Sequence, residues 1–454
     1  MKKLRCTAAV MCLSLLLGII APRALAADAP ELSSAKSALA GDMSSGRILY
    51  SVGAYTRSEP ASITKMMTLL LTVEAVEAGE VSLDDRVTAS KNCRFDLTDD
   101  SSTAHINAGE TMSLEDLMYC AALVSANEAC NIIAEHVSGS TEKFVELMNS
   151  RADELGCSGT HFANTHGLPD KEQYTTARDL FVIACEAMRH PLFAQLVSTV
   201  SYTVPATNVN DERRLKNSNA LINKDSVYTD QYIYEGAVGI KTGRTDSAGY
   251  CLVGAVQREG VNLITVVLGA SGDGEEHKYF DSFGDTVKLL DWCFENYSYR
   301  SVVEKGYAAA VQPVLIDGKR GELTLCCAEE INALAPKELD VSALQKTVTL
   351  NEDTLSAVPG EGAELGSVSF ADEDGNVYGT VKLVAAGEIK YEEPAADKPE
   401  KTGISPQQKL AIVVVCALFV LVAFIVGLAL VRKNRAARAA RSRKKAASRG
   451  GGKR

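Results

Sequence analysis

The part of the sequence that decides the fold is EPASITKMM, residues 59–67. Pro60 suits the first turn of a helix, because its missing N–H would have no intrahelical partner there. The residues that follow, up to Val73, are apolar on nearly every side, which predicts a buried helix. Ser62 and Lys65 are three positions apart and therefore share one face of that helix. We expect the Ser62 hydroxyl and the Lys65 amine to meet at the start of a buried helix.

A serine and a lysine in this position could act as a nucleophile and its general base. Free backbone N–H groups at a helix start favour the negative charge that develops when a hydroxyl attacks a carbonyl. Burial lowers the pKa of a lysine, and a neutral amine can take the proton of a serine. On its own, however, an S-x-x-K pair also fits an ordinary helix start.

Two further short motifs follow in order along the chain. Residues 125–127 read SAN and residues 241–243 read KTG. The SAN segment has two side chains that can take part in catalysis, Ser125 and Asn127, on either side of an alanine. Each tripeptide is common by chance, but all of them in this order in one exported chain indicate a single site.

The two ends of the chain predict export and anchoring. Residues 1–26 have a basic start, an apolar core and an A-x-A cleavage site, as in a signal peptide. Residues 410–431 contain no charge and would form a helix of roughly 33 Å, enough to span a bilayer. Residues 432–454 carry 11 Lys or Arg and no acid, which places them in the cytoplasm. We therefore expect a single-pass protein of the cell membrane with its catalytic domain outside the cytoplasm.

The charge of the chain excludes one class of partner. The net charge is −11, and because the basic tail contributes +11 and the leader +4, residues 27–431 carry about −26. A surface this acidic argues against nucleic acid as a partner. It says little about the substrate, because acidic surfaces mostly serve solubility.

Between the two ends, the pattern first predicts an α+β domain. Residues 37–50 alternate around an SSG turn and read as a hairpin, and residues 67–235 are mainly helical, with helices expected over 114–136 and 141–155. Strands are expected around residues 241–243, 249–257 and 261–269, followed by a helix over about 275–296. Two strands before the helices and three after them predict one antiparallel sheet interrupted by a helical insertion.

Beyond residue 299 the sequence changes to short strand-like runs separated by Gly, Asp and Pro, which predict a small all-β domain without a catalytic constellation. A polar, Pro-containing linker then leads to the membrane. The predicted domains are a signal peptide (1–26), a catalytic domain (27–298), a β-rich domain (299–388), a linker (389–409), a transmembrane helix (410–431) and a cytoplasmic tail (432–454).

Nine cysteines lie outside the leader and the predicted span, namely Cys93, Cys120, Cys130, Cys157, Cys185, Cys251, Cys293, Cys326 and Cys327. The number is odd, so at least one thiol lacks an intramolecular partner, and no C-x-x-C metal spacing is present. Several of them lie in apolar runs and read as small buried hydrophobic residues. No cluster of His, Cys and Asp indicates a catalytic zinc, and we expect neither a metal nor a cofactor.

The sequence resembles the low-molecular-weight penicillin-binding proteins, the D-alanyl-D-alanine carboxypeptidases of peptidase family S11. The likeness covers most of the exported part and rests on PASITKMMT (60–68), SANEA (125–129), FANTHGL (162–168) and KTGRTDSAGY (241–250). S-x-x-K, S-D-N and K-T-G occur together in class A β-lactamases and penicillin-binding proteins. The resemblance implies a serine β-lactamase/transpeptidase-like fold with a β-rich C-terminal domain. It also implies removal of the terminal D-alanine from peptidoglycan stem peptides ending in D-Ala-D-Ala, with β-lactams as covalent inhibitors.

The resemblance also implies the catalytic roles. Ser62 would attack the carbonyl between the two D-alanines and form an acyl-enzyme that water later hydrolyses. Lys65 would accept the proton of Ser62, a role still debated in relatives. Ser125 would relay a proton to the leaving amine, and Asn127 would hold Lys65 and the substrate amide.

The substrate-binding residues would come from the K-T-G strand. Lys241 would add positive charge that keeps Lys65 neutral and attracts the substrate carboxylate, and Thr242 would hydrogen-bond to that carboxylate. Gly243 would let the acyl group lie close to the strand, and the backbone N–H of Arg244 would complete an oxyanion hole with that of Ser62. Many relatives carry an arginine for the carboxylate shortly after residue 269. Residues 271–277 contain none, so the Arg244 side chain would take over this role or would be a plain surface arginine.

Alternative functions remain open at this stage. The same fold could serve a D,D-endopeptidase or a weak β-lactamase, and a degenerate site could serve a non-catalytic peptidoglycan-binding sensor. Residues 212–216 read ERRLK, which lacks the Asn of the E-x-x-L-N deacylation motif and lies 85 residues past Asn127. A β-lactam acyl-enzyme should therefore turn over slowly. The absence of G-x-S-x-G disfavours a Ser-His-Asp hydrolase, and we expect a structural role for His166.

Overall fold

The computed structural model describes residues 29–98, 100–226, 231–272, 280–360, 362–373 and 375–392. The predicted signal peptide, transmembrane helix and tail lie outside the described residues. The chain divides into two units, Met1–Ile389 and Lys390–Arg454, and the second contributes only a short strand, β17 (Lys390–Tyr391), to the described part.

A search of the described residues for membrane spans finds no single helix of sufficient length and apolarity. Only α6 (Ala177–Ala187) and α7 (Pro191–Ser198) pass together, by length and composition, and they are bent by 110° at the break between them.

A five-stranded antiparallel sheet with the order β2-β1-β9-β8-β7 forms the framework of the predicted catalytic domain. Its strands are β1 (Ser37–Asp42), β2 (Ile48–Val52), β7 (Ala237–Thr245), β8 (Gly249–Arg258) and β9 (Val261–Ala270). The central strands β8 and β9 are buried over most of their length, which explains why they read as nearly continuous apolar runs. The prediction of one antiparallel sheet, built from two strands before the helices and three after them, is confirmed.

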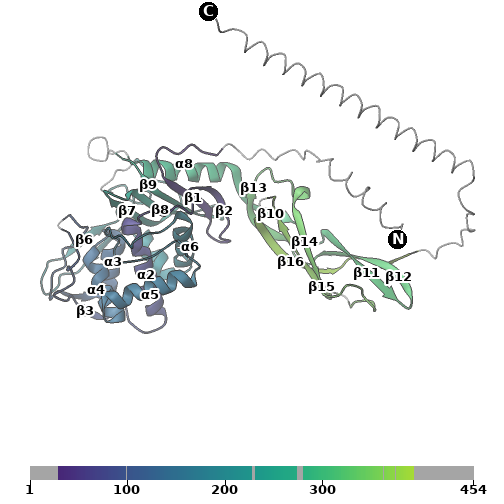
Figure 1. The fold of residues 1–454 in the computed structure, drawn as a ribbon, viewed down its shortest axis with the longest axis horizontal. Helices are drawn as coiled ribbons and strands as arrows, with labels where there is room; N and C mark the ends of the chain where they lie inside the picture. The colour runs from purple at the N-terminus through teal and green to yellow at the C-terminus, as the bar shows by residue number, and fades with distance from the viewer. Residues whose placement is uncertain are drawn as a thin grey trace, which may run out of the picture. The chain divides into compact units, whose positions relative to one another are not determined.

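Helices cover both faces of this sheet (Figure 1). On one face α8 (Asp281–Asn296) packs on β8 and β9, and on the other α6 packs on β1 and β9. The helix after Ser62 is α2 (Lys65–Glu77), which packs against helices α3 to α7 and buries nine of its thirteen residues. The predicted burial of this helix is therefore confirmed.

The other elements of this part are η1 (Ala61–Thr64), α3 (Leu114–Leu123), α4 (Asn127–Ser138), α5 (Thr141–Glu154) and the two-stranded pairs β3 (Arg86–Thr88) with β4 (Thr111–Ser113) and β5 (Ser201–Val204) with β6 (Arg213–Lys216).

The expectation of one helix over 114–136 is wrong, because the chain breaks between α3 and α4. Ser125 has a φ of +61°, a left-handed backbone conformation that an α-helix cannot contain. Residues 114–136 are nearly all buried, so their hydrophobic pattern does not show the break. The break removes Ser125 from helical hydrogen bonding and makes Asn127 the first residue of α4.

The β-rich part consists of strands around its own hydrophobic core. Its strands are β10 (Tyr297–Val303), β11 (Ala308–Ile316), β12 (Lys319–Cys327), β13 (Ile331–Pro336), β14 (Gln345–Leu350), β15 (Glu364–Ala371) and β16 (Val377–Ala385), with a short turn η2 (Val341–Ala343). β11, β12, β16, β15 and β14 form one sheet in that order, and β10 pairs with β13. Its core includes Val368, Phe370 and Leu383, all fully buried. β10 contains residues on both sides of the predicted domain boundary between residues 298 and 299. The division into these two domains stays a prediction.

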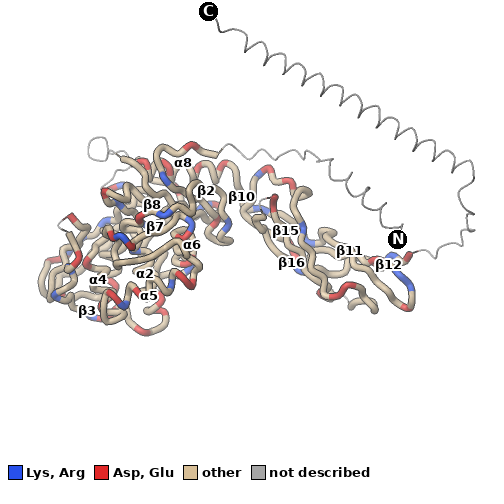
Figure 2. Tube along the Cα trace, in the orientation of Figure 1, with Lys and Arg blue, Asp and Glu red and all other residues tan. Residues whose placement is uncertain are grey.

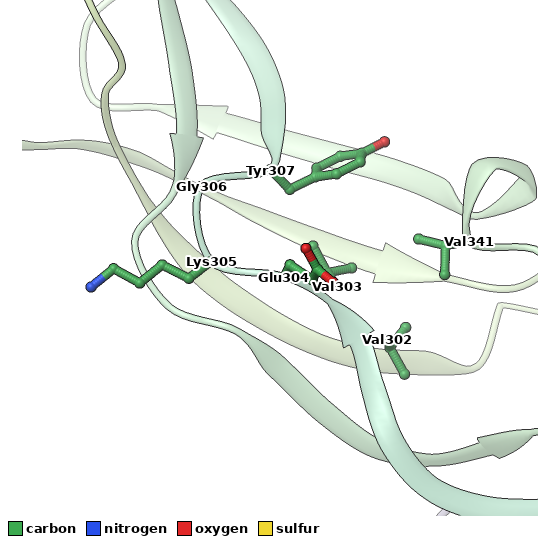
Figure 3. Close-up of a pocket in the computed structure, with 7 residues that line it drawn as sticks. All are labelled: Val302, Val303, Glu304, Lys305, Gly306, Tyr307 and Val341. Carbon is green, nitrogen blue, oxygen red and sulfur yellow. The ribbon is translucent and has the colours of Figure 1, made fainter.

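One hollow of about 340 Å³ lies in the β-rich part, lined by residues 302–307 and Val341 (Figure 3). Valine side chains and the ring of Tyr307 form much of its wall, and the Lys305 side chain extends away from the others. The lining lacks a pairing of nucleophile and base. Acidic and basic residues are scattered along the described chain, as Figure 2 shows.

Candidate active site

Ser62 and Lys65 meet where η1 passes into α2. Ser62 lies in η1, Lys65 is the first residue of α2, and Lys65 Nζ lies 2.9 Å from Ser62 Oγ. The turn before them starts from Ala61, whose φ is +47°, and the Thr64 hydroxyl donates to the Ala61 carbonyl at 2.9 Å. The expected meeting of hydroxyl and amine is present, with the serine in a tighter turn than a regular α-helix.

The Lys65 amine is completely buried and has two further acceptors. Its Nζ donates to Asn127 Oδ1 at 2.6 Å and to the His166 carbonyl at 2.7 Å. With Ser62 Oγ these acceptors match the three N–H groups of an ammonium. Burial lowers the pKa of Lys65 to about 8, although the neighbouring Cys130 and Glu128 oppose this shift. The amine can therefore lose its proton close to neutral pH.

The S-A-N segment contributes the other side of the site. The Ser125 hydroxyl is buried, and within the described part of the chain it has no hydrogen-bond partner. Asn127 presents its side-chain oxygen to Lys65, and its backbone N–H donates to the Ser102 carbonyl at 2.9 Å. A buried hydroxyl without a partner loses hydration that nothing replaces, so it is available for a bound substrate.

The K-T-G segment lies on the edge strand β7, directly against η1. A Cβ built on Gly243 would lie 3.1 Å from the Ser62 backbone nitrogen, which shows how closely the strand passes the nucleophile. Lys241 is buried and donates to the Thr242 carbonyl at 3.0 Å. Burial, and then the positive charge of Lys65, lower the pKa of Lys241 to about 7. The Thr242 hydroxyl lies 2.7 Å from Ser218 Oγ.

Arg244 presents its side chain to solvent rather than to the buried groups. The side chain is 53% exposed and lies 3.5 Å from Asp246, and its guanidinium lies 5.3 Å from the centre of the Tyr250 ring. The structure thus brings the backbone of the K-T-G strand to Ser62 and leaves the Arg244 guanidinium at the surface.

Sequence analysis missed several residues that support the site. The His166 backbone carbonyl holds Lys65, and its ring lies 2.8 Å from Asp96. Glu128 is fully buried and accepts hydrogen bonds from the Thr103 hydroxyl and the Ala104 backbone N–H, which fixes a loop beside Asn127. These contacts join residues far apart in sequence. The sequence signals were the positions of Glu128 within SANEA and of His166 within FANTHGL, and the contacts of His166 agree with the structural role expected for it.

The ERRLK segment has a structural role in the fold. Arg213 Nη2 lies 2.6 Å from Glu110 Oε1, and this glutamate is completely buried. Arg213 also donates to the Ala104 carbonyl at 3.0 Å, so the β5–β6 hairpin is tied to the loop beside the site.

The nine cysteines outside the leader and the predicted span are free thiols, and all but Cys326 are buried. Burial raises the pKa of Cys130 and of Cys251 to about 11, so these thiols stay protonated near neutral pH. This agrees with their interpretation as small hydrophobic residues.

One group of potential metal ligands occurs among the described residues, formed by Glu74, Glu186 and His190. Arg151 Nη2 already lies 2.8 Å from a carboxylate oxygen of each glutamate. A guanidinium that bridges the two carboxylates makes this group part of an ion-pair network.

Comparison with known proteins places this chain in one family. The family model of Peptidase_S11, described as D-alanyl-D-alanine carboxypeptidase, matches residues 23–272. Among curated proteins, the D-alanyl-D-alanine carboxypeptidase DacF of Bacillus subtilis is 30% identical over 356 residues, which cover 78% of this chain and 86% of the relative. The D-alanyl-D-alanine carboxypeptidase DacC of Escherichia coli is 30% identical over 364 residues, covering 79% and 86%.

Solved structures give the same result. Penicillin-binding protein 5 of Haemophilus influenzae is 28% identical with a TM-score of 0.61, covering 80% of this chain and 99% of that one. The DD-transpeptidase of Streptomyces K15 is 31% identical with a TM-score of 0.52, covering 59% of this chain and 98% of that one.

Proposed function

Because this chain belongs to the peptidase S11 family of D-alanyl-D-alanine carboxypeptidases, we propose that the residues gathered around Ser62 carry out the reaction of that family. The chain is a serine-type D-Ala-D-Ala carboxypeptidase. It removes the terminal D-alanine from peptidoglycan stem pentapeptides through an acyl-enzyme, and β-lactams inhibit it. The observation that carries the assignment of residues is the partly buried contact of Lys65 Nζ with Ser62 Oγ at 2.9 Å, with Lys65 held by Asn127.

Acylation begins at Ser62. Its Oγ attacks the carbonyl carbon of the scissile bond while its proton passes to the neutral Lys65 amine. The tetrahedral intermediate collapses as the C–N bond breaks, and the amine of the departing D-alanine takes up a proton. The Ser125 hydroxyl, buried without a described partner, relays this proton from Lys65 to the leaving amine. Water then attacks the ester, and the acid product leaves.

Binding of the substrate carboxylate determines which of the two buried lysines keeps the proton. Lys65 and Lys241 both have lowered pKa values, of about 8 and about 7, and they titrate as a pair. A carboxylate that binds beside Lys241 raises the pKa of this amine, because an opposite charge stabilises the ammonium. The proton that the pair retains then stays on Lys241, and Lys65 is left neutral to act as the base.

The developing oxyanion is stabilised by the strand that carries the K-T-G motif. The backbone N–H groups of Ser62 and Arg244 form the oxyanion hole, and Thr242 adds a hydrogen bond to the substrate carboxylate. Support comes from the close approach of Gly243 to the Ser62 nitrogen. The exposed Arg244 guanidinium would have to leave Asp246 to reach a carboxylate at the rim of the site.

We also propose that the chain is exported and anchored. A cleaved signal peptide at residues 1–26, a transmembrane helix at 410–431 and a basic cytoplasmic tail would place the catalytic part outside the cytoplasm. This proposal rests on the sequence, because these residues lie outside the described part.

The direct test incubates the full-length protein with a stem pentapeptide and measures free D-alanine. We expect release by the wild type and none by Ser62→Ala, with an unchanged unfolding midpoint for the variant. Cleavage of cross-linked dimers alone would indicate an endopeptidase. Binding without turnover would indicate a sensor, and either result would contradict the proposed reaction.

A further inference from the structure

Four side chains behind the active-site lysine form a closed ring of polar contacts. Asp96 Oδ2 lies 2.8 Å from His166 Nε2, and Asp96 Oδ1 accepts a hydrogen bond of 2.8 Å from Asn131 Nδ2. Asn131 Oδ1 in turn accepts a hydrogen bond of 2.6 Å from the Thr165 hydroxyl. Thr165 precedes His166 in the chain, so the ring closes through the backbone.

The directions of these hydrogen bonds require an ionised Asp96. His166 Nδ1 accepts from the Leu168 backbone N–H at 3.2 Å, so its proton is on Nε2 and points at Asp96. Asp96 therefore receives one donor from His166 and another from Asn131, and only a carboxylate accepts with both oxygens. Burial lowers the pKa of His166 and keeps the ring neutral. Burial acts to raise the pKa of Asp96, but the hydrogen bonds that it accepts, first of all from His166 and then from Asn131, outweigh it and hold that pKa below its ordinary value.

The segment that carries His166 is clamped against the helix that carries Lys65. The Thr68 hydroxyl donates to the Thr165 carbonyl at 2.5 Å. Gly167 has a φ of +95°, and a Cβ there would lie 1.8 Å from the Ala61 carbonyl oxygen. The carbonyl of His166 lies between these two contacts, 2.7 Å from Lys65 Nζ.

This carbonyl decides where the lone pair of the neutral lysine points. A neutral amine has two N–H groups and one lone pair. Asn127 Oδ1 and the His166 carbonyl accept the two N–H groups, which leaves the lone pair directed at Ser62 Oγ. If the His166 carbonyl moves, the amine can turn about its Cε–Nζ bond, and the lone pair no longer faces the hydroxyl that it must deprotonate.

We infer that Asp96 is a positioning residue for the catalytic amine: its carboxylate fixes the His166 ring, and the His166 carbonyl then aims the Lys65 lone pair at Ser62. Asp96 lies in the segment between β3 and β4, outside all the motifs that the sequence analysis identified. The inference rests on the proposed function, because it assigns Asp96 to the base that the function requires.

The test is Asp96→Asn in the full-length protein. An asparagine keeps the shape but offers one oxygen and one NH₂ group to two donors, so either His166 or Asn131 loses its acceptor. We expect acylation by a fluorescent penicillin and D-alanine release to fall roughly 10–100-fold, the range that a small misplacement of a catalytic group produces. The alkaline limb of the pH profile of acylation should also move to lower pH. Lys65 has the higher pKa of the two lysines and therefore loses the second proton of the pair, and in the variant its ammonium loses a well-placed acceptor.

Asp100→Asn is the matched control, because it removes the same charge from an exposed side chain in the same segment. It should react at the wild-type rate with the wild-type pH profile. If Asp96→Asn is as fast as the wild type with a superimposable pH profile, the positioning role is overturned. A wild type that neither labels nor releases D-alanine would overturn the proposed function itself, and the positioning role with it.

A measurement on the wild type covers the case in which Asp96→Asn does not fold. In a protein labelled with ¹⁵N-histidine, we expect one imidazole to keep the neutral Nε2–H tautomer below pH 6, where an ordinary histidine of pKa about 6.5 is mostly charged. If all observable imidazoles titrate in the ordinary range, the Asp96–His166 arrangement is contradicted.

Discussion

At the scale of single residues, the proposed mechanism depends on two lysines that the fold buries away from water. Lys65 and Lys241 are both completely or almost completely buried, and neither has a carboxylate within hydrogen-bond distance among the described residues. Burial without a counter-ion favours the neutral amine, which a general base needs. The same burial disfavours the charged form of Lys241 unless an anion binds beside it, so we expect the substrate carboxylate to complete the site.

The first residue-scale prediction is the pH dependence of carboxypeptidase activity. Below both pKa values Lys65 and Lys241 are charged, and no base is available. Loss of one proton makes the pair competent, and loss of the second removes the charge that attracts the carboxylate. We expect kcat/KM to follow a bell-shaped curve with its maximum between about pH 7 and 8, the values to which burial lowers Lys241 and Lys65. Activity that rises steadily to pH 10 would contradict this.

The second residue-scale prediction separates stability from activity at Ser125. Its φ of +61° strains any residue with a Cβ and suits glycine. Ser125→Gly should therefore be more stable than Ser125→Ala, by up to about 1 kcal/mol in urea unfolding. Both variants lack the hydroxyl and should release D-alanine slowly. A Gly variant that is less stable than the Ala variant would show that the strain is absent.

At the scale of elements, the sequence predicted those parts of the site that lie within short motifs. The helix start at Ser62, the K-T-G strand and a single sheet with two strands before the helices and three after them follow from local patterns. The break between α3 and α4 was missed, because burial on both sides of Ser125 hides it from the hydrophobic pattern. His166 and Asp96 were missed as partners, because their contacts span 101 residues to Lys65 and 70 residues between themselves. Long-range hydrogen bonds leave no periodicity in one sequence.

The element-scale prediction concerns the approach of β7 to η1. In Gly243→Ala the new Cβ would lie 3.1 Å from the Ser62 nitrogen and 3.2 Å from the Ala61 Cβ, so strand and turn must separate by a few tenths of an ångström. Because this shift opens the oxyanion hole, we expect kcat to fall roughly 10–100-fold with little change in unfolding midpoint. Gly360→Ala, which has open space around its Cβ, is the control. Equal kcat in the two variants would place the oxyanion hole elsewhere.

At the scale of the whole molecule, the described residues contain all the proposed catalytic residues, and the proposed anchor lies beyond them. The proposed catalytic residues all come from residues 62–244, on the large unit that ends at Ile389. The proposed span and tail begin at Leu410. Catalysis and membrane attachment are therefore separable along the chain.

The whole-molecule prediction follows from this separation. A chain ended after Glu392 should be released from membranes and still produce D-alanine at the full-length rate. A chain ended after Val431, which keeps the span and loses only the basic tail, should stay in the membrane fraction. Sedimentation of membranes followed by the D-alanine assay measures both properties. Membrane retention of the shorter chain would contradict the proposed anchor.

The central claim is that Ser62 is the nucleophile. The most direct measurement is the mass of the intact protein after incubation with benzylpenicillin, followed by peptide mapping of the adduct. We predict a mass increase of one penicillin, located on Ser62, and no increase in Ser62→Ala. An adduct on another residue, or one that forms equally well in the variant, would contradict the account.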